Sequence, residues 1–263
     1  MLSPREEFYK KNIQQFIDKD ATVLICGGGG DDRKVFAHCG FRNVVVSNIN
    51  SDMSKYDWSP FEYVVENAEA LSFPDRTFDY VVIHEAVHHS SSPHRVLTEM
   101  YRVARRGVLA IEARDSSVMR AMVNLNVTSD YEHIAIYLNG FTGGVNNTEI
   151  PNFIFRWTER EVEKTISAFA PYAKHQLFYN YGTRFPFLVR FNQNPLKFII
   201  LKIVQPFFFL FTLLFKKQQN LFAFFIQKPA IPEDLHPWIE YDVKEDRLKF
   251  NRTWGEQNIR TPT

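Results

Sequence analysis

A short apolar run that stops at consecutive glycines is the feature that most limits how this chain can fold. Residues Ala21 to Cys26 carry no charge, and Gly27 to Gly30 follow directly. A continuous apolar run of this length is typical of a strand buried on both faces of a parallel sheet. A strand that ends in a glycine turn and leads into a helix is typical of folds that bind nucleotide-like ligands.

Further apolar runs predict more strands, with helical patterns between them. The predicted strands are Val44–Ser47, Phe78–Ile83 and Gly107–Glu112, and a helix should begin at Ser92-Pro93 and end before Gly107. This alternation predicts βαβ units and therefore an α/β fold with a doubly wound, mostly parallel sheet. A chain of 263 residues is long enough for one such domain with insertions.

The second half of the chain is less regular. Residues 115–156 are aromatic and polar without a clear period, and we interpret them as a cover over the active site. Thr158 and Glu161 match a capping box that predicts a helix to about Phe169. Two more strands are predicted at 175–181 and 221–227. We expect one domain over residues 1–230 and a C-terminal surface tail over 231–263.

Charge and cysteine content exclude several classes of protein. The formal net charge of +1 argues against a nucleic-acid binder. Cys26 and Cys39 are the only cysteines, so we expect neither a disulfide framework nor a metal site. Ser3, Pro4 and Glu6 match the start of a helix rather than a signal peptide. A cytoplasmic location is therefore expected.

The glycine turn lacks the pattern that a diphosphate requires. A dinucleotide fingerprint needs a third glycine where this chain has Asp32 or Arg33, and the negative charges of Asp31 and Asp32 would oppose a pyrophosphate. Asn48, 21 residues after Gly27, follows the second predicted strand, where a polar group should meet ribose hydroxyls. The pattern favours a nucleoside ligand without a diphosphate.

Residues 67–107 carry a more specific pattern. Residues 67–83 read NAEALSFPDRTFDYVVI, followed by EAVHH at 85–89 and PHRVLTEMYRVARRG at 93–107. These stretches resemble the ubiquinone/menaquinone-biosynthesis-like branch of class I methyltransferases (methyltransferase type 11). That branch has the pattern D-A-E-x-L-P-F-x-D-x-x-F-D-x-V, then L-H-H, then E-x-x-R-V-L-x-P-G-G.

The resemblance implies a Rossmann-like, seven-stranded sheet with an antiparallel last strand and S-adenosyl-L-methionine as the cofactor, whose sulfonium cation is compatible with nearby acids. It also implies roles for individual residues. The methionine moiety would meet Gly27, Gly28 and Gly29, the ribose Asn48, the adenine Asn67 and Ala68, and the cofactor would also meet His84 after the fourth strand.

The chain departs from the family pattern at several positions. Ile25 replaces the usual acid of the first strand, Asp31 stands where a glycine is common, and Asn48 and Asn67 each replace an acid. Two other interpretations therefore stay open: a degenerate methyltransferase fold that serves as a binding module at a membrane, and an NAD(P)-dependent oxidoreductase. The missing third glycine and the two acids after the glycine turn count against the oxidoreductase.

Methyl transfer mainly requires that two reactants be positioned and water excluded, and a base is needed only where the acceptor must lose a proton. The candidates for a chemical role are His88, His89, Glu132 and His133. We expect a small or lipid-linked acceptor, with oxygen as the first choice of methylated atom and carbon as the second.

An apolar and basic insertion precedes the last predicted strand, at residues 182–219. Within it, Ile203–Phe215 has only Gln205 and Thr212 as polar residues, is too short to span a membrane, and should be interrupted at Pro206. The flanking bases are Lys197, Lys202, Lys216 and Lys217. Two interpretations stay open. The segment either lies on an anionic membrane, at its inner face, or packs on its own domain or on a second subunit, giving a homo-oligomer through residues 196–217.

Overall fold

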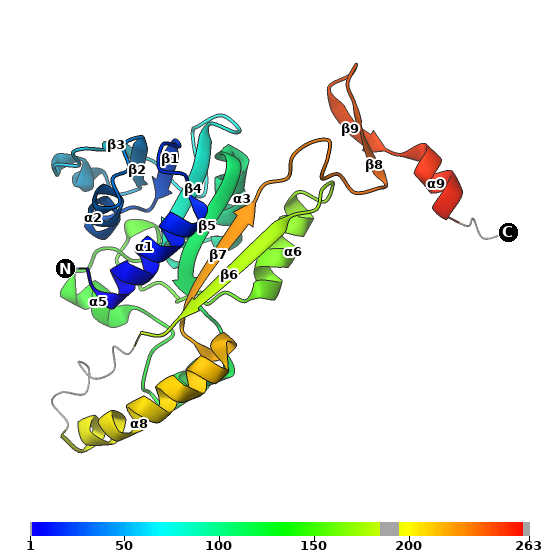
Figure 1. Cartoon of the computed structure of the whole chain (residues 1–263). Helices are drawn as coiled ribbons and strands as arrows, with labels where there is room; N and C mark the ends of the chain where they lie inside the picture. The colour runs from blue at the N-terminus through cyan, green and yellow to red at the C-terminus, as the bar shows by residue number, and fades with distance from the viewer. Residues whose placement is uncertain (1, 185–194, 260–263) are drawn as a thin grey trace.

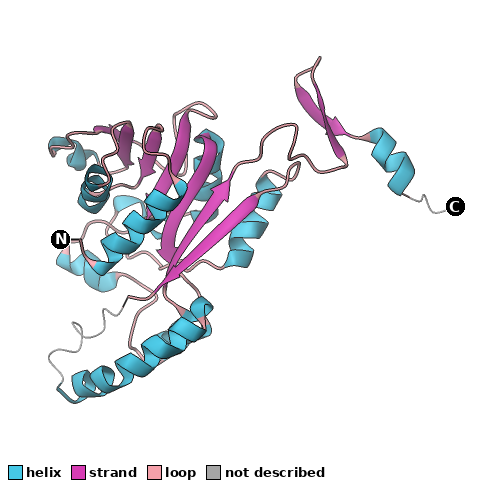
Figure 2. Ribbon diagram, in the orientation of Figure 1, coloured by secondary structure: helices cyan, strands magenta, loops and turns pink. Residues whose placement is uncertain are grey.

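The computed structural model describes residues 2–184 and 195–259. A seven-stranded sheet in the order β3-β2-β1-β4-β5-β7-β6 forms its centre (Figures 1 and 2). The strands are β1 (Val23–Cys26), β2 (Val44–Asn48), β3 (Glu62–Val65), β4 (Phe78–His84), β5 (Ala104–Ala113), β6 (Gln176–Gly182) and β7 (Leu221–Gln227). Strands β1 to β5 pair in parallel, and β7 runs antiparallel to both of its neighbours. The predicted fold class is confirmed.

The apolar runs form strands because both faces of the sheet are covered. Along β1, Leu24 points into a core with helices α3 and α6, while Val23 and Ile25 point into a second core with α1 and α2. Ile25, where the family pattern has an acid, is fully buried in this second core. The edge strand β3 was not among the predicted strands, because Glu62 and Val65 are exposed and no buried run marks it.

The helices connect the strands across the two faces. Those of the sheet region are α1 (Pro4–Phe16), α2 (Gly30–His38), α3 (Pro93–Val103), α4 (Ser117–Asn124), α5 (His133–Leu138) and α6 (Glu159–Phe169). Short 3-10 helices are η1 (Ser51–Lys55), η2 (Val87–His89), η3 (Val145–Asn147) and η4 (Lys216–Gln218). Helix α1 begins with the expected capping box, in which Ser3 and Glu6 bond each other's backbone N–H groups.

Helix α8 (Pro195–Leu214) lies between β6 and β7, beyond the carboxyl edge of the sheet (Figure 1). The predicted interruption at Pro206 is wrong, because the helix continues through this residue. A proline removes one backbone hydrogen bond, and the turns on both sides evidently sustain the helix here. Residues 185–194 of the predicted insertion lie outside the described residues. Among the residues that are described, no helix has both the length and the apolar character needed to cross a membrane.

The chain after Pro229 first follows the domain and then leaves it. Leu235 bridges to Ala173, and the backbone N–H of His236 donates to the carbonyl of Tyr172. A hairpin of β8 (Ile239–Asp242) and β9 (Arg247–Phe250) then leads to α9 (Arg252–Asn258), away from the sheet (Figure 1). The expected tail therefore contains a hairpin and a helix that its polar composition did not indicate.

Candidate active site

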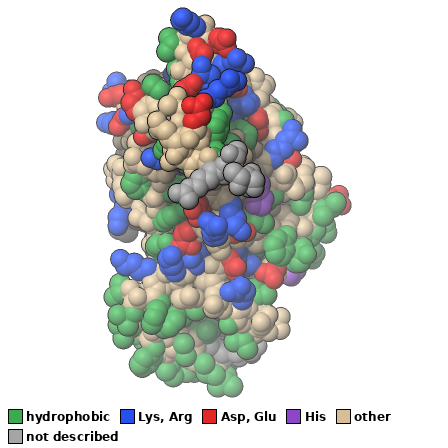
Figure 3. Space-filling view, turned by 90° about the vertical axis from the view of Figure 1, so that its right-hand side faces the viewer, with side chains coloured by type: hydrophobic (Ala, Val, Ile, Leu, Met, Phe, Trp, Pro, Cys, Tyr) green, Lys and Arg blue, Asp and Glu red, His purple; other side chains and the backbone are tan. Residues whose placement is uncertain are grey.

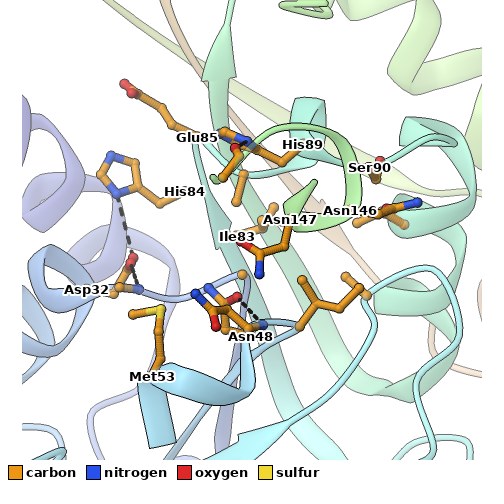
Figure 4. Close-up of a pocket in the computed structure, with 18 of the residues that line it drawn as sticks. Asp32, Asn48, Met53, Ile83, His84, Glu85, His89, Ser90, Asn146 and Asn147 are labelled. Atoms are coloured by element: carbon orange, nitrogen blue, oxygen red, sulfur yellow. Dashed lines mark hydrogen bonds and ion pairs between the residues drawn. The ribbon is translucent and has the colours of Figure 1, made fainter. Parts of the chain in front are cut away.

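A cavity of about 570 Å³ opens at the carboxyl ends of β1, β2 and β4 (Figure 4). The strand order reverses between β1 and β4, so the loops that follow these strands diverge and leave a crevice. The segment that we interpreted as a cover contributes part of the wall. Its lining residues are Asn139, Thr142, Gly143, Gly144, Asn146 and Asn147.

Two of the predicted glycines line this cavity for conformational reasons. Gly27 has φ of +61°, and a Cβ there would lie 2.7 Å from the Cβ of Ala86. Only glycine takes this position without strain. Gly29 is the N-cap of α2, and its N–H donates to Oδ2 of Asp32 at 2.8 Å. At Gly27 and Gly29 the cavity is therefore lined by backbone atoms that no side chain covers.

Gly28 does not line the cavity, and Asn48 has a second function besides lining it. A Cβ on Gly28 would lie 2.5 Å from Cγ1 of Val46, so this glycine allows the turn to pack against β2. The carbonyl of Gly28 accepts from Nδ2 of Asn48 at 3.0 Å, and Oδ1 of Asn48 accepts from the N–H of Asn50 at 3.0 Å. Asn48 thus joins the loop after β2 to the glycine turn.

The predicted adenine residues lie in the cavity wall with two apolar side chains that the sequence analysis did not single out. Asn67 and Ala68 line the cavity after β3, and Asn67 forms an Asx turn by accepting from the N–H of Glu69 at 2.9 Å. Ile49 and Met53 line the same part of the wall, after β2. Apolar side chains at this place suit the flat face of a purine.

His84 lies at the centre of a charged network from three elements. Its ring stacks on Tyr9 of α1 with centroids 4.1 Å apart. Its Nε2 accepts from Nε of Arg5 at 3.3 Å, and its Nδ1 lies 3.6 Å from Oδ1 of Asp32. Arg5 also pairs with Glu85 at 2.5 Å. The four charged or titratable groups line the cavity, and Figure 4 shows the pair of His84 and Asp32.

Asp32 carries an oxygen that lacks a hydrogen bond. The residue is 5% exposed, and within the described ranges its Oδ1 accepts no hydrogen bond, although His84 lies near it. A buried carboxylate oxygen without a donor costs free energy unless a ligand supplies one. A cationic ligand group with N–H donors would satisfy it.

The backbone beside this network is also strained. Glu85 has φ of +47°, a left-handed conformation that is costly for a residue with a Cβ. Such strain is often found where a side chain must be held in place for a ligand.

His88 forms a buried ion pair behind the cavity wall. Its Nδ1 lies 2.9 Å from Oε2 of Glu112, while Oε1 of Glu112 accepts from the N–H groups of Ala86 and Val87. Burial by itself would lower the pKa of His88, but the charges of Glu112 and Glu132 outweigh it and raise the pKa to about 10. His88 is therefore an imidazolium at neutral pH and holds the loop after β4.

His89 lines the cavity and differs from its neighbour in charge. Its Nδ1 lies 2.9 Å from the carbonyl oxygen of Gly143, which can only accept, so Nδ1 carries a proton. Burial and the charge of His88 lower the pKa of His89 below its usual 6.5. Nε2 then has a free lone pair, and it lies 3.5 Å from Oε2 of Glu132.

The four residues predicted for a chemical role are not all together. The imidazolium of His88, whose Nε2 lies 3.7 Å from Oε1 of Glu132, lowers the pKa of Glu132 to about 2, with a contribution from Asn152. This makes the carboxylate a weak base. His133, the first residue of α5, is exposed and does not line the cavity. The potential ligand atoms of His88, His89 and Glu132 lie within 4.8 Å of one another, so these three side chains could also hold a divalent cation.

Comparison with known proteins agrees with this geometry. Residues 24–111 match a family described as a methyltransferase domain. The ubiquinone/menaquinone biosynthesis C-methyltransferase UbiE of Hydrogenovibrio crunogenus is 33% identical over 99 residues, which cover 34% of this chain and 39% of that protein. The UbiE protein of an Enterobacter species is 34% identical over 103 residues, covering 35% and 41%. The match thus spans about two fifths of these relatives' own length.

Solved structures share the fold over most of the chain. A protein from Pyrococcus horikoshii has a TM-score of 0.51 at 18% identity, covering 86% of this chain and 90% of that one. A SAM-dependent methyltransferase from Thermotoga maritima, described as a possible histamine N-methyltransferase, has a TM-score of 0.50 at 10% identity, covering 86% and 92%. Residues 24–111 are thus similar to a methyltransferase domain, and the chain shares its fold with a solved methyltransferase structure over most of its length.

Proposed function

We propose that the chain binds S-adenosylmethionine in the cavity and methylates a hydroxyl group of a small or lipid-linked acceptor. The observation that carries the proposal is the buried carboxylate of Asp32, a residue of the cavity wall whose Oδ1 accepts no hydrogen bond from the described residues. Asp32 and Arg5, which also lines the cavity, contact the two ring nitrogens of His84. The methionine end of the cofactor has an ammonium and a carboxylate. Asp32 would accept from the ammonium and Arg5 would pair with the carboxylate.

This arrangement supplies the acid that the first strand lacks. The family pattern has an acid at the position of Ile25, which here is an apolar core residue. Asp32, in the first turn of α2, offers a carboxylate to the cavity instead. Gly27 would allow close approach of the cofactor to backbone, Asn48 would meet the ribose, and the apolar side of Met53 would meet the adenine.

His89 is the residue best suited to remove a proton from an acceptor hydroxyl. When bound, S-adenosylmethionine supplies an electrophilic methyl group. The neutral His89 presents Nε2 as an acceptor, and the proton that it takes would form an imidazolium 3.5 Å from the carboxylate of Glu132. This neighbouring negative charge stabilises the imidazolium, so proton removal and charge stabilisation occur at one place.

Methylation at carbon is the second candidate, and one observation favours it. The similar curated proteins are described as C-methyltransferases. The similarity covers residues that surround the cofactor region, whereas the wall from Asn139 to Asn147 lies outside the matched family domain. The part of the wall that would contact the acceptor therefore lies outside the region of similarity to the methyltransferase domain.

Transfer of a labelled methyl group tests the proposal. The protein would be incubated with methyl-labelled S-adenosylmethionine and membrane or soluble extracts, and the labelled product treated with hydriodic acid. This acid cleaves methyl ethers and leaves C-methyl groups, so release of the label supports a hydroxyl acceptor. Retention of the label in the product would instead establish carbon methylation. Absence of both transfer and cofactor binding would favour a binding module.

Removal of metal ions separates the two chemical roles open to the histidine cluster. With His89 as a base, dialysis against EDTA leaves the methyl-transfer rate unchanged. Loss of the rate on dialysis, restored by one equivalent of a divalent transition metal, would assign His88, His89 and Glu132 to a metal site.

A further inference from the structure

Helix α8 presents an apolar face to solvent. Residues spaced by three or four positions lie on one side of a helix. On this side of α8 the side chains are all large and apolar, with exposures from 40% at Phe211 to 71% at Leu214. The face consists of Leu196, Ile199, Ile200, Ile203, Val204, Phe207, Leu210, Phe211 and Leu214. A continuous apolar surface of this kind marks an interaction site.

The opposite side of the helix faces its own chain near the C-terminal end. Thr212 is 1% exposed, and its hydroxyl lies 3.4 Å from that of Thr183, at the end of β6. Nε2 of Gln219 donates to the carbonyl of Thr212 at 3.1 Å. The helix is thus fixed to the domain at one end, and the apolar face points away from this attachment. The interpretation in which the insertion packs fully on its own domain does not fit this arrangement.

Basic side chains accompany the apolar face. Lys202 lies within α8, and Lys216 and Lys217 follow it in η4. The sequence from 164 to 232 contains no Asp or Glu. In Figure 3 the hydrophobic side chains gather at the lower end of the molecule, with a row of Lys and Arg side chains above them. This combination of an apolar face and a basic border complements a surface with an apolar interior and anionic groups at its boundary.

We infer that the apolar face of α8 lies in the interface of an anionic lipid bilayer, with the helix parallel to the membrane plane. A second copy of the chain is the competing occupant. In a symmetric dimer through this face, the same patch of each copy meets the other, so the basic borders would lie near one another. Lys217 pairs with Glu159 at 3.5 Å, but the segment itself offers no acid to Lys202 and Lys216, whereas anionic headgroups would neutralise both.

The location of α8 connects this surface to the proposed function, on which this last step rests. The segment that contains α8 begins after Gly182, the last residue of β6, and ends before Leu221, the first residue of β7. These two residues pair with each other at the edge of the sheet where β5 also ends. The cavity opens at the carboxyl ends of the neighbouring parallel strands, on the same edge. A bilayer against α8 would thus lie on the side of the molecule where the acceptor enters, which favours a lipid-linked acceptor.

Flotation with vesicles tests the inference. The full-length protein would be mixed with vesicles of phosphatidylcholine and phosphatidylglycerol at low salt and separated on a density gradient. We expect the protein to float with these vesicles and to remain below with phosphatidylcholine alone. Charge reversal by Lys202→Glu and Lys216→Glu should weaken vesicle binding by at least fivefold for each substitution. The double variant Phe207→Asp, Leu210→Asp should reduce the bound fraction by tenfold or more.

A matched control uses an apolar side chain exposed elsewhere. Val243→Asp changes a residue of the distant hairpin that is 81% exposed, and it should float like the parent protein. All variants should retain S-adenosylhomocysteine binding. A variant that no longer floats but still binds S-adenosylhomocysteine therefore tests the membrane surface alone, and loss of S-adenosylhomocysteine binding would instead concern the proposed function. The inference is overturned if the parent protein stays in the soluble fraction and sediments as a dimer, or if Phe207→Asp, Leu210→Asp floats as well as the control.

Discussion

Asp32 and His84 illustrate how the site depends on side chains that are distant in sequence. His84 was predicted from its place after the fourth strand, but its partners Arg5 and Asp32 come from α1 and α2. No local pattern relates position 5 to position 84, because helix packing across the sheet brings them together. The sequence therefore predicted the strand ends that carry the site and did not predict the ion pairs between them.

The free oxygen of Asp32 leads to a prediction about cofactor affinity. Asp32→Asn keeps an oxygen that can accept from the N–H of Gly29 but removes the negative charge beside the proposed ammonium. The Kd for S-adenosylhomocysteine should rise by about 10-fold to 100-fold, the usual value of a charge-assisted hydrogen bond. Calorimetric titration measures this. Asp31→Asn, at the exposed neighbouring residue, is the matched control. An equal rise in Kd for both variants would show that the net negative charge near the cavity, and not a direct contact of Asp32, determines the affinity.

Proton removal by His89 leads to a prediction about rate. His89→Gln should lower kcat by about 10²-fold to 10⁴-fold and leave cofactor affinity within about twofold. Because the pKa of His89 lies below 6.5, activity should be constant near pH 7 and fall as the pH decreases through that lower value. His133→Gln, at the exposed histidine that follows Glu132 and does not line the cavity, should keep the parent rate. A pH profile unchanged in His89→Gln would contradict the assignment.

At the scale of elements, the buried strands were predictable and the exposed ones were not. β7 is buried at every residue but its last, and its predicted bounds agree with the structure. Exposed elements such as the hairpin of β8 and β9 lack such a run, and β9 is exposed throughout. The continuation of α8 through Pro206 was also not predicted. The prediction rested only on the backbone hydrogen bond that a proline removes, and not on the helical turns on either side.

The loop that carries Asn67 and Ala68 is fixed by one arginine of α3. Arg102 donates to the carbonyls of Leu71 and Phe73 at 2.9 Å. It also pairs with Asp75 and Glu99 at 2.8 Å. Glu99 also accepts from the N–H of Leu71, so Arg102 and Glu99 together hold this loop against α3.

Loss of this arginine should therefore affect both stability and binding. We expect Arg102→Leu to lower the free energy of unfolding by about 2 to 3 kcal/mol, because several hydrogen bonds to a charged group are removed together. It should also weaken S-adenosylhomocysteine binding, since Ala68 lines the cavity. Urea denaturation and calorimetry would measure the two effects. Arg160→Leu removes only an exposed pair with Glu163 and should change stability by less than about 0.5 kcal/mol.

At the scale of the whole molecule, we expect His175, which directly precedes β6 and contacts α3, to contribute to the loss of stability in acid. Its Nε2 lies 2.7 Å from the hydroxyl of Tyr101. Burial, with the charges of His236 and Lys228, lowers the pKa of His175 to about 4. The unfolded chain binds this proton near pH 6.5, so stability is fully present above that pH and is lost as the pH falls toward 4.

His175→Gln should remove this dependence. Allowing for solvent screening at a partly exposed site, the parent protein should lose about 1 kcal/mol more than the variant between pH 7 and pH 4.5. Urea denaturation at the two pH values measures the difference. Equal losses in the two proteins would show that other groups determine the acid response.

The proposed function requires that the cavity accept S-adenosylmethionine rather than a dinucleotide. Calorimetric titration of the purified protein with S-adenosylhomocysteine and, separately, with NADH measures this directly. The charges of Asp31, Asp32 and Glu85 around the glycine turn predict binding of S-adenosylhomocysteine at one site per chain and no measurable binding of the diphosphate. Saturable binding of NADH without binding of S-adenosylhomocysteine would contradict the proposed methyltransferase function.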